Sequence, residues 1–255
     1  MSEQLYTKQF SITVPAGKRL IAKAVASLKP ITDALRDGTI VVVSGTTNAY
    51  VAEELLALAN QTGYFDRHTF FRGITTAPGA KLNVDADAPK DIVLEQGKWV
   101  KDKTIFDAAP TLGPGDIILK GANAVDCERK VAGIQIGNPT LGTSGALLPA
   151  VIGRRVQLII PVGLEKRVCG DINVIAEKLS APSADGPRLL PVSGTIVTEL
   201  EAIGQLTGTH AELVAAGGVL GAEGGCYIAV TGTEAQLQAA SELIRSVARE
   251  PAFGV

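Results

Sequence analysis

The chain has little net charge, and this argues against partners that are themselves strongly charged polymers or surfaces. Its 255 residues include 24 basic and 26 acidic side chains, which leaves a formal net charge of −2. Proteins that hold nucleic acid or anionic lipid over a broad surface carry an excess of basic residues. We therefore expect no nucleic-acid partner and no membrane-surface role.

Long apolar runs, paired cysteines and clustered histidines are also missing. No apolar run approaches the about 20 residues of a spanning helix, and the amino end, MSEQLYTKQF, lacks the pattern of a secretory signal. Cys127, Cys169 and Cys226 lie too far apart in sequence to indicate a disulfide framework or a paired zinc site. His68 and His210 have no patterned carboxylates nearby. We expect a cytoplasmic, reduced protein without a metal or a cofactor.

What the sequence does contain is an alternation of buried strands with amphipathic helices. Its β-branched runs do not alternate with polar residues, as in strands covered on both faces. Strands are expected at 39–43, 116–119 and 156–160, and helices at 15–37 (split near Pro30), 49–62, 147–151 and 171–179. Candidate strands at 70–71 and 91–94, and a hairpin turn at 96–98, lie between them. The pattern predicts an α/β fold, a parallel sheet with helices on both faces.

A second unit is expected after the linker SAPSADGP at 180–187. The expected order is a strand at 188–192, a helix at 195–206, strands at 211–215 and 226–230, and a helix at 234–248. This order predicts a small ferredoxin-like α+β unit, closed by residues 252–255. The domains are then 1–183, an α/β core, and 184–255. The glycines between 217 and 225 indicate a flexible hairpin, with a ligand-covering flap as the alternative.

The turn between the first buried strand and its helix is a candidate anion site. Gly45 permits close backbone approach, and Ser44, Thr46 and Thr47 offer hydroxyl groups at a helix start with free amides. Helix capping by Thr47 or Asn48 is an equally weighted alternative. The sequence contains neither GxxxxGK[ST] nor GxGxxG, which argues against a P-loop nucleotide triphosphatase and a Rossmann dehydrogenase.

Four short segments resemble one superfamily. Residues 40–48, IVVVSGTTN, resemble the phosphate loop of ribose-5-phosphate isomerase A and, more closely, the SGTT loop of DeoR-type sugar-phosphate effector domains. Residues 116–126, DIILKGANAVD, resemble the isomerase segment built around DGADE. Residues 142–147, GTSGAL, and 159–168, IIPVGLEKRV, resemble its KGGGGAL turn and IVIADESKLV loop. The chain thus resembles ribose-5-phosphate isomerase A, glucosamine-6-phosphate deaminase and coenzyme A transferases over 15–62 and 112–255.

The resemblance implies an anion site without the isomerase chemistry. The family's functional acidic and lysine positions hold Lys120, Asn123 and Leu141 here, and 146–152 contain no carboxylate. Lys166 matches a family lysine. Moving a proton between sugar carbons needs a general base, and Asn123 cannot accept that proton.

Three further residues are weighed as catalytic groups. Asp126 could be a displaced base, although a turn or cap role is favoured. Glu165 resembles in position the acidic nucleophile of coenzyme A transferases, and a solvated Glu165–Lys166 pair is the favoured alternative. Cys127 could be a nucleophile, and a packed thiol is favoured.

We predict that the protein binds a small phosphorylated or carboxylated metabolite, a sugar phosphate, as a homo-oligomer. The expected ligand-binding residues lie at the strand ends; they are Ser44, Gly45, Thr46, Thr47, Asn48, Lys120, Asn123, Gly142, Thr143, Ser144 and Lys166. A divergent isomerase or coenzyme A transferase-like enzyme, using Asp126, Glu165 or Lys166, is one alternative. A non-catalytic scaffold or regulatory subunit is another. Whether the protein is an enzyme stays open.

Overall fold

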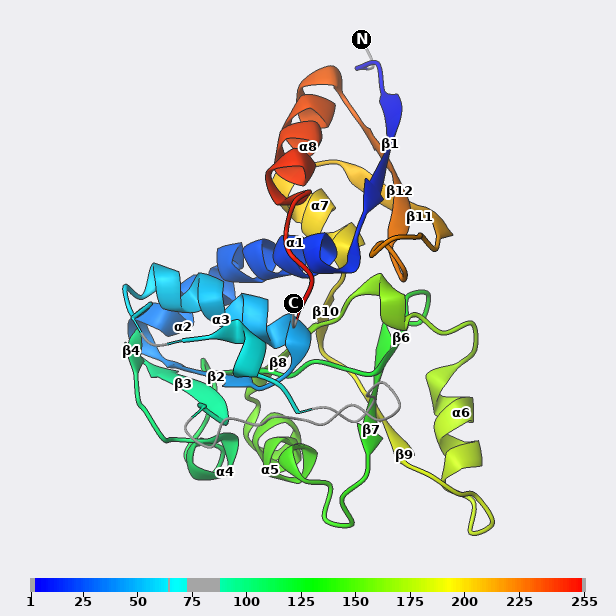
Figure 1. The fold of residues 1–255 in the computed structure, drawn as a ribbon. Coiled ribbons are helices and arrows are strands. Elements are labelled where there is room, and N and C mark those ends of the chain that lie inside the picture. The colour runs from blue at the N-terminus through cyan, green and yellow to red at the C-terminus, as the bar shows by residue number, and fades with distance from the viewer. Residues whose placement is uncertain (1–2, 64, 73–87, 254–255) are drawn as a thin grey trace.

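The computed structural model describes residues 3–63, 65–72 and 88–253. Its central sheet has six strands, in the order β10 (Thr195–Val197), β8 (Gln157–Pro161), β5 (Ile117–Leu119), β2 (Thr39–Val43), β3 (Asp91–Glu95) and β4 (Lys98–Trp99). The first four strands are parallel, whereas β3 and β4 pair antiparallel. The expected α/β class is confirmed in this coarser form, because the sheet is mixed and only its core is parallel (Figure 1).

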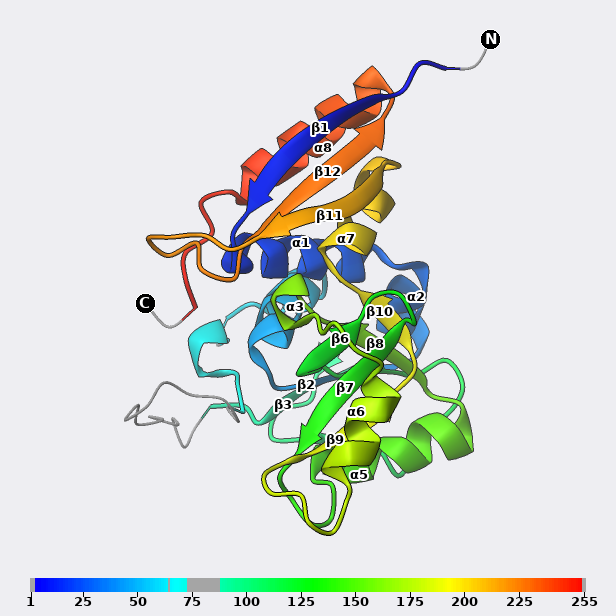
Figure 2. The same ribbon diagram turned by 90° about the vertical axis from the view of Figure 1, so that its right-hand side faces the viewer.

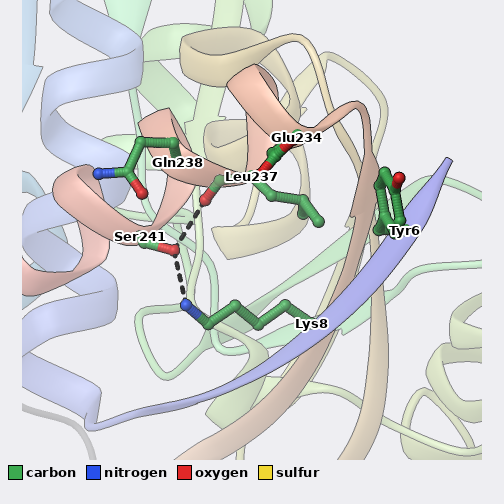
Figure 3. Close-up of a pocket in the computed structure, with 6 residues that line it drawn as sticks. All are labelled: Tyr6, Lys8, Glu234, Leu237, Gln238 and Ser241. Atoms are coloured by element: carbon green, nitrogen blue, oxygen red, sulfur yellow. Dashed lines mark hydrogen bonds between the residues drawn. The ribbon is translucent and has the colours of Figure 1, made fainter. Parts of the chain in front are cut away.

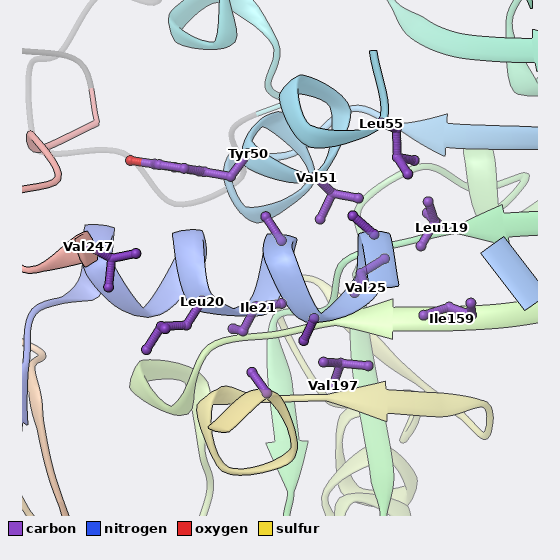
Figure 4. Close-up of a cluster of buried hydrophobic side chains, with 14 of the residues drawn as sticks. Leu20, Ile21, Val25, Tyr50, Val51, Leu55, Leu119, Ile159, Val197 and Val247 are labelled. Atoms are coloured by element: carbon purple, nitrogen blue, oxygen red, sulfur yellow. The ribbon is translucent and has the colours of Figure 1, made fainter. Parts of the chain in front are cut away.

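Each core strand sends alternate side chains to two separate cores, because successive residues of a strand point to opposite faces. From β2, Ile40 and Val42 pack with α1 (Val14–Ser27) and α3 (Thr46–Leu58). Figure 4 shows α1 between Val51 of α3 on one side and Val197 of β10 on the other. Val41 and Val43 instead pack with α4 (Ile105–Ala108) and α5 (Thr143–Leu148) on the other face. Helices therefore cover both faces, as predicted.

Proline divides the first helical region in two, as the sequence predicted. α1 begins after Thr13, whose hydroxyl accepts the Ala16 amide at 3.4 Å. It ends at Ser27, and α2 (Lys29–Asp37) follows with Pro30 in its first turn. Leu28 between them is extended, and it serves both as the last cap residue of α1 and as the first cap residue of α2.

A small antiparallel sheet is built differently from the expected carboxy-terminal unit. Its strands are β1 (Tyr6–Ile12), β12 (Cys226–Gly232) and β11 (His210–Ala216), packed against α7 (Glu199–Thr207) and α8 (Glu234–Val247) (Figure 2). The expected first strand of this unit, 188–192, is wrong, since the amino-terminal strand β1 takes that place in the sheet. Residues 252–253 form no strand, and 254–255 lie outside the described residues.

The predicted strand at 188–192 forms, in another sheet. It is β9 (Arg188–Val192), which pairs with β7 (Val131–Ile136), and β7 pairs with β6 (Ala124–Asp126). α6 (Ile172–Leu179) packs against this third sheet. The predicted helix at 195–206 is also shorter, because β10 takes its first residues and a Thr198–Glu201 capping box starts α7. The domain boundary at 183 stays a prediction.

The region between α3 and β5 holds short elements. The predicted strand at 91–94 and the turn at 96–98 are confirmed as the β3–β4 hairpin. Phe70 and Phe71 do not form a strand; Phe70 follows a 3₁₀ turn (Arg67–Thr69) and packs edge-on against Phe65. A π-helical turn (Pro149–Gly153) follows α5, and a 3₁₀ turn (Leu164–Lys166) follows β8. No helix in the described part of the chain is long and apolar enough to cross a membrane.

A charged cluster ties the carboxy-terminal segment to α1 and α3. Two guanidinium groups contact the Tyr50 ring, that of Arg19 at 4.8 Å and that of Arg67 at 4.9 Å from its centroid. Arg19 also bonds three carboxylates, those of Glu53, Glu54 and Glu250. Beyond Glu250, the Phe253 ring lies 6.4 Å from the Tyr50 ring and 5.9 Å from Lys18 Nζ.

Candidate functional site

The carboxyl ends of three parallel strands converge at one edge of the central sheet. Ser44 follows β2, Lys120 follows β5, and the Leu164–Lys166 turn comes shortly after β8. Ligands of open α/β sheets bind beyond such ends. The site is therefore built around the start of α3.

Backbone and side-chain hydrogen bonds hold the loop that opens α3. The Ser44 amide donates to Asp91 Oδ1 at 3.0 Å, and Asn48 Nδ2 donates to the Val43 and Leu119 carbonyls at 2.7 and 3.0 Å. No side chain caps α3, so neither Thr47 nor Asn48 serves as its cap. Ser44 Oγ, Thr47 Oγ1 and Asn48 Oδ1 are buried without a partner among the described residues. Polar atoms in that state usually await a ligand or water.

Three lysines gather around this loop. Lys18 of α1 is 8% exposed and donates to Thr46 Oγ1 at 3.3 Å. Burial lowers the pKa of Lys18, with a smaller lowering from Lys166. Burial also lowers the pKa of Lys120 to about 8, and Arg72 and Lys166 lower it further while Asp91 opposes them. Lys166 is therefore close enough to both lysines to lower the pKa of each.

Asp91 is the anchor of the loop, and sequence reasoning placed it only in a strand. Its side chain is fully buried, and its oxygens accept from the Ser44 amide, the Ile105 amide and Arg72. Burial raises the pKa of Asp91, and Arg72 opposes that rise. The signal in the sequence that could have identified Asp91 was a carboxylate at the first position of an otherwise apolar strand.

Glu165 is half-buried and its carboxylate is turned away from solvent, which corrects the predicted solvated pair with Lys166. Both its carboxylate oxygens are inaccessible and lack a hydrogen-bond partner among the described residues. The carboxylate folds back over Gly163, where an added Cβ would collide with it. An added Cβ at Gly224, in the glycine-rich turn between β11 and β12, would lie 3.7 Å from Glu165 Cβ. That turn therefore lies over Glu165.

A second carboxylate, Glu199, lies against the Leu164–Lys166 turn and was missed by sequence reasoning. Glu199 is 3% exposed, and its Oε2 accepts the Leu164 amide at 2.9 Å. It lies against Gly17 of α1, where an added Cβ would collide with Oε1. Burial raises the pKa of Glu199 to about 7; Glu165 adds to the rise, and Lys166 opposes it. The signal in sequence was a glycine inside a helix, which weakens the helix unless another group needs the space.

Asn123 and Asp126, two of the predicted functional residues, are occupied elsewhere. Asn123 Oδ1 accepts the Gln135 amide at 3.0 Å, at the edge of the third sheet. Asp126 accepts the amides of Glu128 and Arg129 at 3.1 and 3.0 Å. These backbone bonds lower the pKa of Asp126, so it closes a turn rather than serving as a base.

The glycine turn before α5 and the thiol at 127 are the remaining predicted groups. No hydrogen bond or ion pair within the described ranges joins Gly142, Thr143 or Ser144 to the loop at 44–48. α5 is a six-residue helix. Burial raises the pKa of the Cys127 thiol, which disfavours the thiolate that a nucleophile needs.

A separate shallow pocket lies between β1 and α8. Its volume is about 310 Å³, and Figure 3 shows its lining, which comprises Tyr6, Lys8, Glu234, Leu237, Gln238 and Ser241. Its lysine is already bonded, because Lys8 Nζ donates to Ser241 Oγ at 3.1 Å. None of the residues predicted to bind a ligand lines it. We place the candidate site at the strand ends instead, where the unpartnered polar atoms and lysines gather.

Comparisons of the chain with family models, curated proteins and solved structures found no match. The resemblance to the isomerase and transferase superfamily therefore rests on the four segments quoted above. Over the described residues, no group of three or more His, Cys, Asp or Glu side chains is placed to hold a metal ion.

Proposed function

We propose that the protein binds a small anionic metabolite, a sugar phosphate, at the start of α3. The anion accepts hydrogen bonds from the free amides of residues 45–48 and faces Lys18, Lys120 and Lys166. One observation carries this proposal. Three ammonium groups lie near the start of α3, that of the buried Lys18 and those of the half-buried Lys120 and Lys166, and across the described ranges no ion pair joins any of them to a carboxylate.

The energetics of the lysines support a phosphate. Buried ammonium groups that face one another are costly unless an opposite charge compensates them. A phosphate supplies two negative charges and several acceptor oxygens, and helix amides add favourable dipoles. Binding is then accompanied by proton uptake near pH 8, because the anion restores the charged form of Lys120, whose pKa lies at about 8 in the free protein.

A specific observation favours a second function, a divergent isomerase or transferase that uses Glu165. Its carboxylate oxygens are buried and unpartnered beside the lysines, whereas those of Asp126 are engaged in a turn. The version with Asp126 as base is therefore not retained. The third alternative is a non-catalytic scaffold, which binds neither a ligand nor a substrate at these residues.

Isothermal titration calorimetry with ribose 5-phosphate and with inorganic phosphate tests the binding proposal. We expect Lys166→Ala and Lys120→Ala each to weaken ribose 5-phosphate by tenfold or more, since charge-assisted hydrogen bonds contribute about 1.5–3 kcal/mol. Lys178→Ala, an exposed lysine on α6, is the matched control. Unchanged affinity in both site variants would show that the anion site is misplaced.

An activity assay separates the second function from simple binding. Interconversion of ribose 5-phosphate by the wild type, abolished in Glu165→Gln, supports an enzyme. Binding without turnover leaves the binding protein as the function. Neither binding nor turnover favours the scaffold.

A further inference from the structure

Glu165 has an unusual place among the buried acids of this protein. Asp91 receives two backbone amides and a guanidinium, and Glu199 receives an amide. Glu165, in contrast, has both oxygens inaccessible and no donor within the described residues. A buried carboxylate without donors is costly, and natural proteins retain such groups where a missing partner completes them.

The position of this carboxylate is built by several elements. It rests on Gly163, which leaves it room. The preceding residue, Leu164, is held by a hydrogen bond that its backbone amide donates to Glu199. The Glu199 carboxylate in turn occupies the space left by Gly17. Gly224 lies over Glu165 from the glycine-rich turn. Two glycines thus make room for two carboxylates, and a third lies over one of them.

Glu165 borders the lysines that receive the anion. Its charge raises the pKa of Lys18 against the effect of burial, and Lys166 is its neighbour in the chain. Glu165 is therefore an acceptor beside the lysines that lacks a donor within the described residues. A hydroxyl group is the neutral donor that satisfies a carboxylate without adding charge to a cationic site.

We propose that Glu165 accepts a hydrogen bond from a hydroxyl group of the bound anion and so makes the site selective for hydroxylated phosphate esters. Glu199 acts as a positioning residue through the Leu164 amide. This inference rests on the proposed function, since it takes the phosphate to lie at the start of α3. It adds the part of the ligand that is recognised beyond the phosphate.

A pair of small esters tests this selectivity directly. Glycerol 3-phosphate and propyl phosphate share a three-carbon chain and a phosphate, but only the first carries hydroxyl groups. In calorimetric titrations of the full chain, we expect the wild type to bind glycerol 3-phosphate at least tenfold more tightly, as for a hydrogen bond to a charged group. In Glu165→Ala the two affinities should agree within about twofold, and Glu165→Gln should lie between.

The controls separate this inference from the binding proposal. Glu177→Ala removes an exposed carboxylate on α6 and should keep the wild-type ratio, and circular dichroism checks that each variant is folded. If the wild type binds both esters equally, or if Glu165→Ala keeps the ratio, the hydroxyl contact is refuted while the anion site stands. If neither ester nor inorganic phosphate binds, the proposed function fails and this inference falls with it.

Discussion

Glu199 should make the protein less stable as the pH rises through the range of ordinary buffers. The folded protein keeps the Glu199 carboxyl protonated up to a pKa of about 7, whereas the ordinary value is 4.5. Between these values the folded state therefore binds more protons than the unfolded state. The linkage relation then requires the free energy of unfolding to fall with increasing pH.

The size of this effect follows from the interval between the two pKa values. From 4.5 to about 7, at about 1.4 kcal/mol for each pH unit, the loss amounts to about 3 kcal/mol. Glu165 and Lys166 are the charges that face Glu199, and burial is the larger cause. In Glu199→Gln the amide cannot ionise, and its oxygen can still accept the Leu164 amide. The variant should therefore lack this loss.

Urea unfolding at pH 5 and at pH 8 measures the difference. We expect the wild type to lose about 2.5 kcal/mol more than Glu199→Gln between the two conditions, because pH 5 already lies above the ordinary pKa of 4.5. Carboxylates whose pKa is lowered, such as Asp126 and Glu201, titrate in both proteins and cancel in the comparison. Parallel pH profiles for the two proteins would refute the reasoning, because a solvated or fully paired Glu199 has no such dependence.

Three further expectations concern neighbouring groups. Lys120, with a pKa of about 8 against an ordinary 10.5, should make the free energy of unfolding rise between those pH values, and Lys120→Met should flatten that rise in urea titrations. Gly17→Ala should displace the Glu199 carboxylate, so its free energy of unfolding should depend on pH in the same way as that of Glu199→Gln in the same urea titrations. If Gly17→Ala instead keeps the whole wild-type loss between pH 5 and pH 8, the contact between Gly17 and Glu199 is contradicted. Arg19→Ala should cost about 2–4 kcal/mol in thermal or urea unfolding, because it removes a guanidinium shared by three carboxylates and the Tyr50 ring; a loss below 1 kcal/mol would mean that the cluster is solvated.

Local signals in the sequence were sufficient for most elements of the central sheet. The β-branched run at 39–43 and the proline that splits 15–37 act over a few residues, and both have the expected result. The pairing of β1 was beyond such signals. Its burial pattern is mostly exposed, and its partner β12 lies more than 200 residues further along the chain, so only tertiary packing selects the pair.

The candidate site was predictable where strand ends define it. The loop at 44–48, Lys120 and Lys166 follow directly from the order of strands and turns. Lys18 and Glu199 were missed because each lies on a helix whose face toward the site depends on how α1 and α7 pack. Asn123 was taken from a resemblance of segments, and its side chain completes a sheet edge instead.

The segment that ends at Phe253 connects Lys18 of the proposed anion site with the salt-bridge cluster. Lys18 Nζ lies over the Phe253 ring. Arg19, the next residue of α1, forms an ion pair with Glu250. A ligand that draws the Lys18 ammonium toward itself competes with that aromatic contact. Affinity for the ligand and order in residues 250–253 are then one linked equilibrium, in which each changes the other by the same factor.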